Sequence, residues 1–208
     1  MAILTSILII TLIVIFIVIG IWFAWGLISP HIWEQPAYKV VERFDKAEIR
    51  HYYPTKVIIT EDSTDGNAFS KLASFIFGEN REKEKIAMTA PVVSESGKKD
   101  PVKMMFFLPK KYNEEDIPTP KNDEILIQDL PAWNAGVIRF YGRMTEKKRK
   151  KYERKLLEIL KQYNYEQINE SFLMQYSDPF VPPPLRRNEV GFIINIPENK
   201  ANFEIKAS

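Results

Sequence analysis

The sequence predicts an α+β domain that follows a single N-terminal transmembrane helix. The first 30 of the 208 residues carry no charged side chain, whereas all 56 charged residues (29 Lys or Arg and 27 Asp or Glu) lie in the remaining 178. Those 178 residues show the order strand, strand, helix, strand, strand twice. Their length suits one medium domain or two small pseudo-repeats with a proper core.

Residues 3–28 are almost continuously apolar. A spanning helix needs about 20 apolar residues, and a helix is the conformation that satisfies the backbone of a single segment in hydrocarbon. Trp22, Trp25 and Trp33 cluster at the downstream end, where amphipathic rings favour the headgroup layer, and Pro30 ends the helix. We therefore expect residues 1–30 to be a transmembrane anchor, 31–37 a linker, and 38–208 the folded domain.

A cleaved signal peptide is the alternative for this segment. It fits less well because the run is too long, no basic residue precedes it, and no small-x-small cleavage site follows. Lys39, Arg43 and Lys46 follow the span, while no Lys or Arg precedes it. The positive-inside tendency therefore favours the cytoplasmic side for the domain.

The first half of the domain begins with strands at residues 38–41, 47–53 and 56–60, where apolar and polar residues alternate. A helix follows, because its apolar residues recur at helical spacing and Gly78 stands at the stop position. These apolar residues are Phe69, Leu72, Ala73 and Ile76. Residues 86–93 and 102–108 are expected to form two more strands.

The second half repeats this order after a loop that contains Pro118 and Pro120. Strands are expected at residues 124–130 and 135–141, then at 172–176 and 189–196. Between them Thr145 caps a long helix with an apolar stripe of Tyr152, Leu156, Ile159, Leu160 and Tyr163. Two such halves would join their sheets, place both helices outside and leave a concave, apolar-lined space.

Motifs that carry catalysis are absent from the sequence. It has no G-x-S-x-G elbow, H-E-x-x-H helix, P-loop or G-x-G-x-x-G turn. The chain has no cysteine, which excludes disulfides, thiolate catalysis and zinc–thiolate or iron–sulfur sites. We therefore expect no enzymatic activity. A net charge of +2 argues against nucleic acid as a partner.

Three features have a functional and a plain structural interpretation. His51 is either an axial ligand of haem iron or, as we favour, a strand residue that faces solvent, so no metal site is predicted. The basic run Lys147–Lys151 either lies against anionic lipid or, as we favour, is a solvated helix face. Met88, Met104 and Met105 suit either a pocket for a flat ligand or an ordinary core.

Residues 84–93, EKIAMTAPVV, resemble the signature of the SOUL haem-binding protein family. Three further segments agree with the family in the right order: AEIRHY at 47–52, AFSKLASFIFGEN at 68–80, and DPFVPPPLRRNEV at 178–190. The resemblance spans roughly residues 38–196, and it departs at Gly191, where the family usually has Trp.

This resemblance implies a twisted, largely antiparallel, barrel-like sheet of two repeats with two flanking helices. The same architecture resembles the effector-binding domains of bacterial multidrug-sensing regulators. Family members bind haem and other tetrapyrroles in a shallow apolar groove beside the first helix of the domain. Carried onto this chain, the groove would be lined by Phe69, Leu72, Ala73 and Ile76, with Met88 beside it, Phe180 as a cover, and Lys71 as the nearby cation for the propionates.

The predicted function is that of a membrane-anchored protein that binds haem or a related porphyrin without catalysis. The alternative is a regulatory or interaction module that senses another flat hydrophobic ligand or docks a membrane partner.

Overall fold

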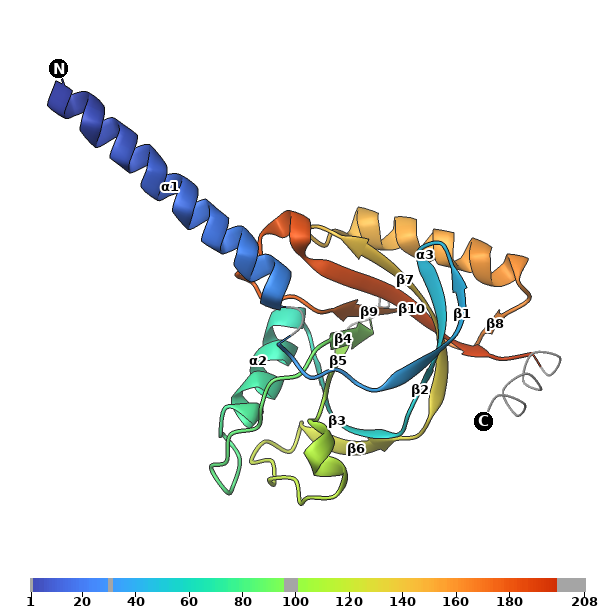
Figure 1. Cartoon of the computed structure of the whole chain (residues 1–208). Coiled ribbons are helices and arrows are strands. Elements are labelled where there is room, and N and C mark those ends of the chain that lie inside the picture. Colours follow the sequence, from blue (N-terminus) through green and yellow to red (C-terminus); the bar gives the residue numbers. More distant parts are fainter. Residues whose placement is uncertain (1, 30–31, 96–100, 198–208) are drawn as a thin grey trace.

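The computed structural model describes residues 2–29, 32–95 and 101–197, and it confirms the α+β class (Figure 1). The helix α1 (Ala2–Ile28) projects away from a domain whose curled sheet is flanked by α2 (Asp65–Ile76) and α3 (Glu146–Gln162). The strands are β1 (Tyr38–Phe44), β2 (Ala47–Tyr52), β3 (Thr55–Asp62), β4 (Val92–Glu95), β5 (Val102–Phe107), β6 (Leu126–Leu130), β7 (Trp133–Tyr141), β8 (Glu166–Gln167), β9 (Phe172–Gln175) and β10 (Arg187–Asn195). Pro30 and His31 lie outside the described residues.

The sheet has the strand order β1-β2-β7-β10-β9-β4-β5-β3-β6, with β8 paired to β10. All of these pairs are antiparallel. The two halves meet at the β4–β9 pair. Leaving aside the edge strand β1, the repeated strands are β2, β3, β4 and β5 in the first half and β6, β7, β9 and β10 in the second. The first of each set pairs with the second of the other, as β2–β7 and β6–β3. This arrangement confirms the predicted two-repeat, barrel-like sheet.

Both domain helices pack on the convex face of the sheet. Thr64 accepts a hydrogen bond from the Asn67 amide at the start of α2, and Thr145 accepts one from the Lys148 amide at the start of α3. Helix α2 packs on β3 and β5, whereas α3 packs on β7 and β10. Gly136 of β7 lets α3 approach closely, because a Cβ there would lie 2.6 Å from Leu160 Cδ2.

The predicted strand at residues 86–93 is wrong over its first part, since β4 begins at Val92. Pro91 has no amide hydrogen to donate to a strand ladder. Residues 86–90 use other partners: the Ala90 amide donates to Glu34 O (2.9 Å), and Thr89 Oγ1 donates to Phe107 O (2.6 Å). The segment expected as a linker thus contacts the domain through Glu34, and Trp33 packs against the interior.

Helix α1 is docked on the domain at its C-terminal end. Trp22 Nε1 donates to Phe180 O (2.6 Å), and Ser29 Oγ donates to Asp178 Oδ2 (2.9 Å). Gly26 is buried against Pro182, because a Cβ at Gly26 would lie 2.7 Å from Pro182 Cδ. The rest of α1 is exposed, and by length and composition this helix is able to cross a membrane.

The domain's own side chains pack on the concave side of the sheet. Aromatic and aliphatic residues fill one part of it, including Tyr52, Trp133 and Phe172. The rings of Tyr52 and Trp133 stack with centroids 4.3 Å apart. Beside this cluster lies the fully buried carboxylate of Glu189.

Glu189 on β10 receives hydrogen bonds from three arginines on three strands. Arg50 of β2 donates through both terminal nitrogens (2.7 and 3.1 Å), Arg139 of β7 through Nε (3.0 Å), and Arg187 through Nε and Nη2 (3.1 and 2.7 Å). Tyr176 Oη also donates to it (2.9 Å). Burial alone would raise the pKa of the Glu189 carboxyl, but the hydrogen bond and charge of Arg50 and the charge of Arg187 lower it to about 2.

Gly191 is explained by Phe172. A Cβ at Gly191 would overlap Cζ of the Phe172 ring, so the ring occupies the space beside this glycine. The interior therefore keeps an aromatic side chain at this point, although it comes from β9 and not from position 191.

The free energy of unfolding should fall at low pH, where Glu189 becomes protonated and its ion network is lost. The folded-state pKa of Glu189 lies below its ordinary value of 4.5. Its contribution to the free energy of unfolding is therefore complete above about pH 5 and is lost as the pH falls toward 2. Glu189→Gln should cost about 3–5 kcal/mol at pH 7, because Arg50 remains buried after losing its fully buried carboxylate and keeps only the partly exposed Glu48 as an acidic partner among the described residues. Urea unfolding of the full chain in micelles from pH 7 to pH 2.5 measures both effects.

The exposed Glu61→Gln is the matched control for this experiment, and it should leave the stability at pH 7 within about 0.5 kcal/mol of the wild type. Equal stability of Glu189→Gln and Glu61→Gln at pH 7 would contradict the role given to the network.

Gly191→Ala should destabilise the domain by about 1–3 kcal/mol, since the Phe172 ring must move. Gly66→Ala in α2 is the control, because nothing lies within 4 Å of a Cβ there, and it should leave stability unchanged or raise it. In a double-mutant cycle, Phe172→Ala should remove most of the cost of Gly191→Ala. Strictly additive effects would show that the ring is not the obstacle.

Candidate ligand-binding site

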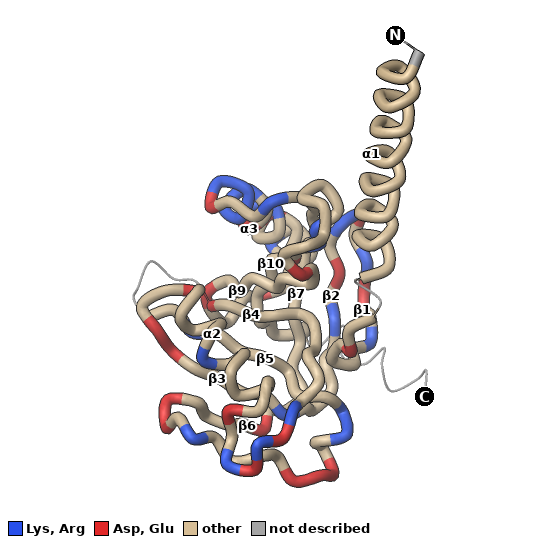
Figure 2. Tube along the Cα trace, turned by 90° about the vertical axis from the view of Figure 1, so that its left-hand side faces the viewer, with Lys and Arg blue, Asp and Glu red and all other residues tan. Residues whose placement is uncertain are grey.

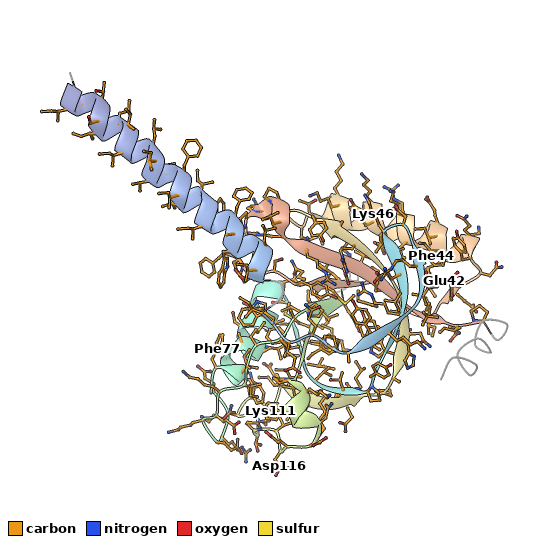
Figure 3. All side chains as sticks on the ribbon, viewed as in Figure 1. Glu42, Phe44, Lys46, Phe77, Lys111 and Asp116 are labelled. Carbon is orange, nitrogen blue, oxygen red and sulfur yellow. The ribbon has the colours of Figure 1, made fainter. Side chains whose placement is uncertain are left out.

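One side of α2 presents an apolar, partly exposed surface. Phe69, Ala73 and Phe77 follow one another at intervals of four residues, so they lie along one side of the helix. Phe69 is 41% exposed and Phe77 is 64% exposed, while Ala73 between them is nearly buried. Phe77 lies at the outer edge of the domain beside α2 (Figure 3). We call these three residues the α2 flank.

The α2 flank is supported by a well-packed core. The ring of Phe69 lies 5.4 Å from that of Phe106 on β5, and Phe106 pairs in register with the half-buried Val92 on β4. Leu72 and Ile76 are fully buried in this core. Of the expected groove residues, Phe69 thus faces outward, whereas Leu72 and Ile76 hold α2 on the sheet.

The remaining expected site residues are spread over three places. Met88 is half-buried and packs against the core under α2. Phe180 is 76% exposed and lies in the loop that contacts α1 through Trp22. Lys71 lies on the other side of α2 from Phe69, as their separation of two residues requires.

Lys71 is engaged in two ion pairs. Its Nζ lies 2.6 Å from Asp62 Oδ2 and 2.6 Å from Glu124 Oε2. The hydrogen bonds to Asp62 and Glu124 raise the pKa of Lys71 above its ordinary value. A ligand carboxylate would therefore compete with two carboxylates of the protein for this ammonium group.

His51 lies away from α2, on β2. Its Nδ1 is 2.8 Å from Asn134 Oδ1 on β7. Within residues 2–29, 32–95 and 101–197, no group of three or more His, Asp or Glu side chains is arranged to hold a metal ion.

Three residues of the motifs that carry the family resemblance, Arg50, Asn80 and Glu189, are buried and stabilise the fold. Arg50 of AEIRHY and Glu189 of the Arg-Asn-Glu-Val segment form the buried ion pair. Asn80 is fully buried; its Nδ2 donates to Phe75 O (3.1 Å) and Glu84 O (2.6 Å), which joins the end of α2 to residue 84. Sequence reasoning did not single out Phe77 or Val92. The four-residue interval from Phe69 through Ala73 was the available signal for Phe77.

Two depressions lie away from α2. One, of about 550 Å³, lies beside the β1–β2 turn between Lys46, Arg139 and Tyr152. The other, of about 1300 Å³, lies between α3 and β8–β9 and has Phe172, Phe192 and Ile168 among its apolar walls. The charged groups lining the larger one are four glutamates and two basic residues: Glu95, Glu146, Glu153, Glu170, Arg149 and Lys150. This excess of carboxylates disfavours an anionic ligand there.

The fold resembles that of several solved structures. The C-terminal domain of EcmrR aligns with a TM-score of 0.54 at 14% identity, over 76% of this chain and 98% of that domain. A structure described as a hydrolase from Listeria innocua aligns with a TM-score of 0.54 at 9% identity, over 74% of this chain and 94% of that one. At such low identity these matches show a shared fold alone.

Relatives are also found by sequence. Heme-binding protein 2 of Mus musculus is 30% identical over 178 residues, which cover 77% of this chain and 85% of the relative. Heme-binding protein 2 of Homo sapiens is 32% identical over 127 residues, covering 55% of this chain and 62% of the relative. The profile of the family described as SOUL heme-binding protein matches residues 33–193. The chain therefore belongs to the SOUL haem-binding protein family.

Proposed function

We propose that the chain is a membrane-anchored, non-catalytic protein that binds haem or a related tetrapyrrole on the α2 flank. The observation that carries the proposal is the match to the SOUL haem-binding family over most of the folded domain. The position is supported by the flank itself, because two exposed phenylalanines separated by a small alanine form a surface on which a flat ring can lie.

The α2 flank offers apolar surface for the porphyrin ring but no cation for the propionate groups. Each 100 Å² of apolar surface that the ring covers contributes about 2.5 kcal/mol, before the costs of ordering are subtracted. Lys71 faces the other side of α2 and is already paired with Asp62 and Glu124. The propionates would remain in solvent, so we expect weak and exchangeable binding that suits buffering or transfer of a tetrapyrrole.

We further propose that α1 is a retained single-pass anchor for residues 1–30, with the domain on the cytoplasmic side. Support for the anchor comes from its apolar length and from the exposure of its side chains. Support for the orientation comes from the basic residues Lys39, Arg43 and Lys46 just after it. We propose that the ligand-binding domain begins at Trp33, because the packing against the interior and the family match both begin at this residue.

A second candidate function is supported by the larger depression. Its apolar walls and excess of glutamates suit a flat hydrophobic cation, which would make the chain an effector-sensing module. The two candidates use different surfaces, so they are separable by substitution.

Substitution of Phe69 should weaken haem binding. Phe69→Asp places a charge on the flank without opening the core, unlike any change at the buried Leu72. We expect the dissociation constant for haem to rise at least about tenfold, or about 1.4 kcal/mol. Titration of the full chain in micelles, followed by the Soret band and by tryptophan quenching, measures this change.

Two further variants complete the haem titration. Leu126→Asn alters an exposed apolar residue on β6 and should leave haem affinity unchanged. Ile168→Arg alters the larger depression and should also leave haem affinity unchanged, but it should abolish binding of a hydrophobic cation such as tetraphenylphosphonium. Haem binding that is lost in Ile168→Arg and kept in Phe69→Asp would overturn the α2 flank as the site.

His51 is not expected to bind the iron. Its Nδ1 is engaged with Asn134, and β2 lies on the part of the sheet away from α2. His51→Ala should therefore leave the position of the Soret band and the haem affinity unchanged. A shift of the band in this variant would show that the imidazole is an axial ligand.

A further inference from the structure

Positive charge is concentrated on α3 and the turn before it. Residues 143–162 contain nine Lys or Arg and three Glu, a net charge of +6, whereas the whole chain carries only +2. The remainder of the chain is therefore net negative, at −4. Several of these cations also occupy the first turns of the helix, where the helix dipole disfavours positive charge.

Four of the exposed cations of α3 follow one line along the helix. Residues four, seven and eight positions apart lie on the same side of a helix. Counted from Lys147, these positions are Lys151, Arg154 and Lys155. All four are exposed, and the apolar Leu156 and Leu160 are buried on the opposite side. We call these four residues the α3 basic face.

The α3 basic face has no acidic partners in the part of the chain that the structure describes. No ion pair within 4.0 Å is formed by any of its four residues there, although Arg149 and Lys150 beside it pair with Glu146. Elsewhere in the domain, basic groups such as Arg50 and Lys71 meet carboxylates at 2.6–2.8 Å. Glu158 is exposed on the same side of the helix, three residues from Lys155 and four from Arg154. Within the described part of the molecule the face therefore has four cations and one carboxylate, a net charge of +3.

The α3 basic face lies on the side of the domain from which α1 leaves. Figure 1 shows α3 along that edge, with the end that begins at Glu146 nearer to α1. Figure 2, turned by 90°, again shows the basic residues of α3 gathered toward the end of the domain from which α1 extends. The loop that bears the exposed Phe180 lies on α1 at the level of Trp22.

We propose that the α3 basic face and Phe180 form a surface that docks the domain on an anionic bilayer leaflet. The proposal rests on α1 spanning that same bilayer. At 1.5 Å per residue the 27 residues of α1 extend about 40 Å, some 10 Å more than the hydrocarbon core requires. Trp22 therefore lies near the headgroup layer, and so does Phe180, whose carbonyl accepts its hydrogen bond.

Docking on the leaflet fixes the orientation of the domain. Ser29, just after α1, contacts Asp178, and Gly26 of α1 packs against Pro182. These contacts hold the loop against the helix, so the domain does not move freely relative to the anchor. Charge complementarity then favours the tilt that brings the N-terminal half of α3 to anionic headgroups. A lipid surface accounts for the cations, the exposed phenylalanine and the apolar helix together, whereas a nucleic acid would account for the cations alone.

The test uses the full chain in nanodiscs of phosphatidylcholine, with or without 30% phosphatidylserine. Lysines are acetylated with a neutral reagent, and the rate at each is followed by mass spectrometry. A surface potential of about −30 mV lowers the local pH enough to slow acetylation about threefold. We expect at least this slowing at Lys147, Lys151 and Lys155 with phosphatidylserine, and its loss in 0.5 M NaCl. Lys110 and Lys121, exposed on the loop between β5 and β6, are internal controls and should not respond.

Charge variants identify the surface. Because the chain has no cysteine, Gln162→Cys at the exposed end of α3 allows one donor dye without changing the charge of the face. Energy transfer to a headgroup dye then reports its approach to the bilayer. Phosphatidylserine should raise the transfer in the parent chain and in a matched control with Lys85, Lys110, Lys111 and Lys121 changed to Gln. The rise should vanish when Lys147, Lys151, Arg154 and Lys155 are changed to Gln.

The outcomes separate this proposal from the anchoring on which it rests. A chain that leaves the discs in alkaline carbonate would overturn the anchor itself. A chain that stays in the discs but shows equal acetylation rates in both lipids would overturn the docking alone. Protection of the same lysines by an RNA oligonucleotide in phosphatidylcholine discs, without any effect of phosphatidylserine, would identify the face as a nucleic-acid surface and overturn the lipid assignment.

Discussion

The buried carboxylate of Glu189 is the constraint on which the rest of the domain depends. Arg50 of β2, Arg139 of β7 and Arg187 of its own strand converge on it. Among the described residues only Arg50 has a second carboxylate partner, Glu48, so loss of Glu189 would leave the other two charges uncompensated. A buried ion pair contributes little to stability compared with a packed apolar core, but loss of one partner is costly. The network therefore links β2, β7 and β10 through side chains, in addition to the backbone ladders that pair β2 with β7 and β7 with β10.

This network also occupies part of the predicted concave space. The curled sheet has the predicted concave side. Its side chains, including Tyr52, Trp133, Phe172 and the Glu189 network, are buried there. An internal carboxylate that is already surrounded by guanidinium groups offers nothing further to a cation. The proposed binding surfaces are accordingly on the outside, on the α2 flank and in the depression beside α3, where side chains are only partly covered.

Local pattern predicted most of the elements. The helical spacing of Phe69, Leu72, Ala73 and Ile76 and the cap at Thr145 give both domain helices, and alternation gives most of the strands. The apolar residues before Val92 resemble a strand, and this pattern predicts the wrong element. Pro91 has no amide hydrogen to donate to a strand ladder, and the Ala90 amide donates to Glu34 O, more than 50 residues earlier in the chain.

The site was less predictable than the fold. Apolar spacing identifies one side of a helix, but it does not separate residues under the helix, such as Leu72, from residues at its edge, such as Phe69. The state of Lys71 depends on Glu124, which follows a long loop and is brought beside α2 only when β6 pairs with β3. Likewise, Arg50 and Glu189 belong to two motifs that contact each other in the fold, and this contact is not evident from the sequence because the two residues are 139 positions apart.

The exchange of first strands between the two halves has a consequence for the history and the folding of the domain. Because β2 completes the second half and β6 completes the first, neither half has a full set of strand neighbours on its own. A single ancestral unit with this pairing would be complete only as an intertwined dimer. Fusion of two such units into one chain converts that association, which depends on concentration, into an intramolecular one. The two halves should consequently melt as one cooperative unit and not in succession.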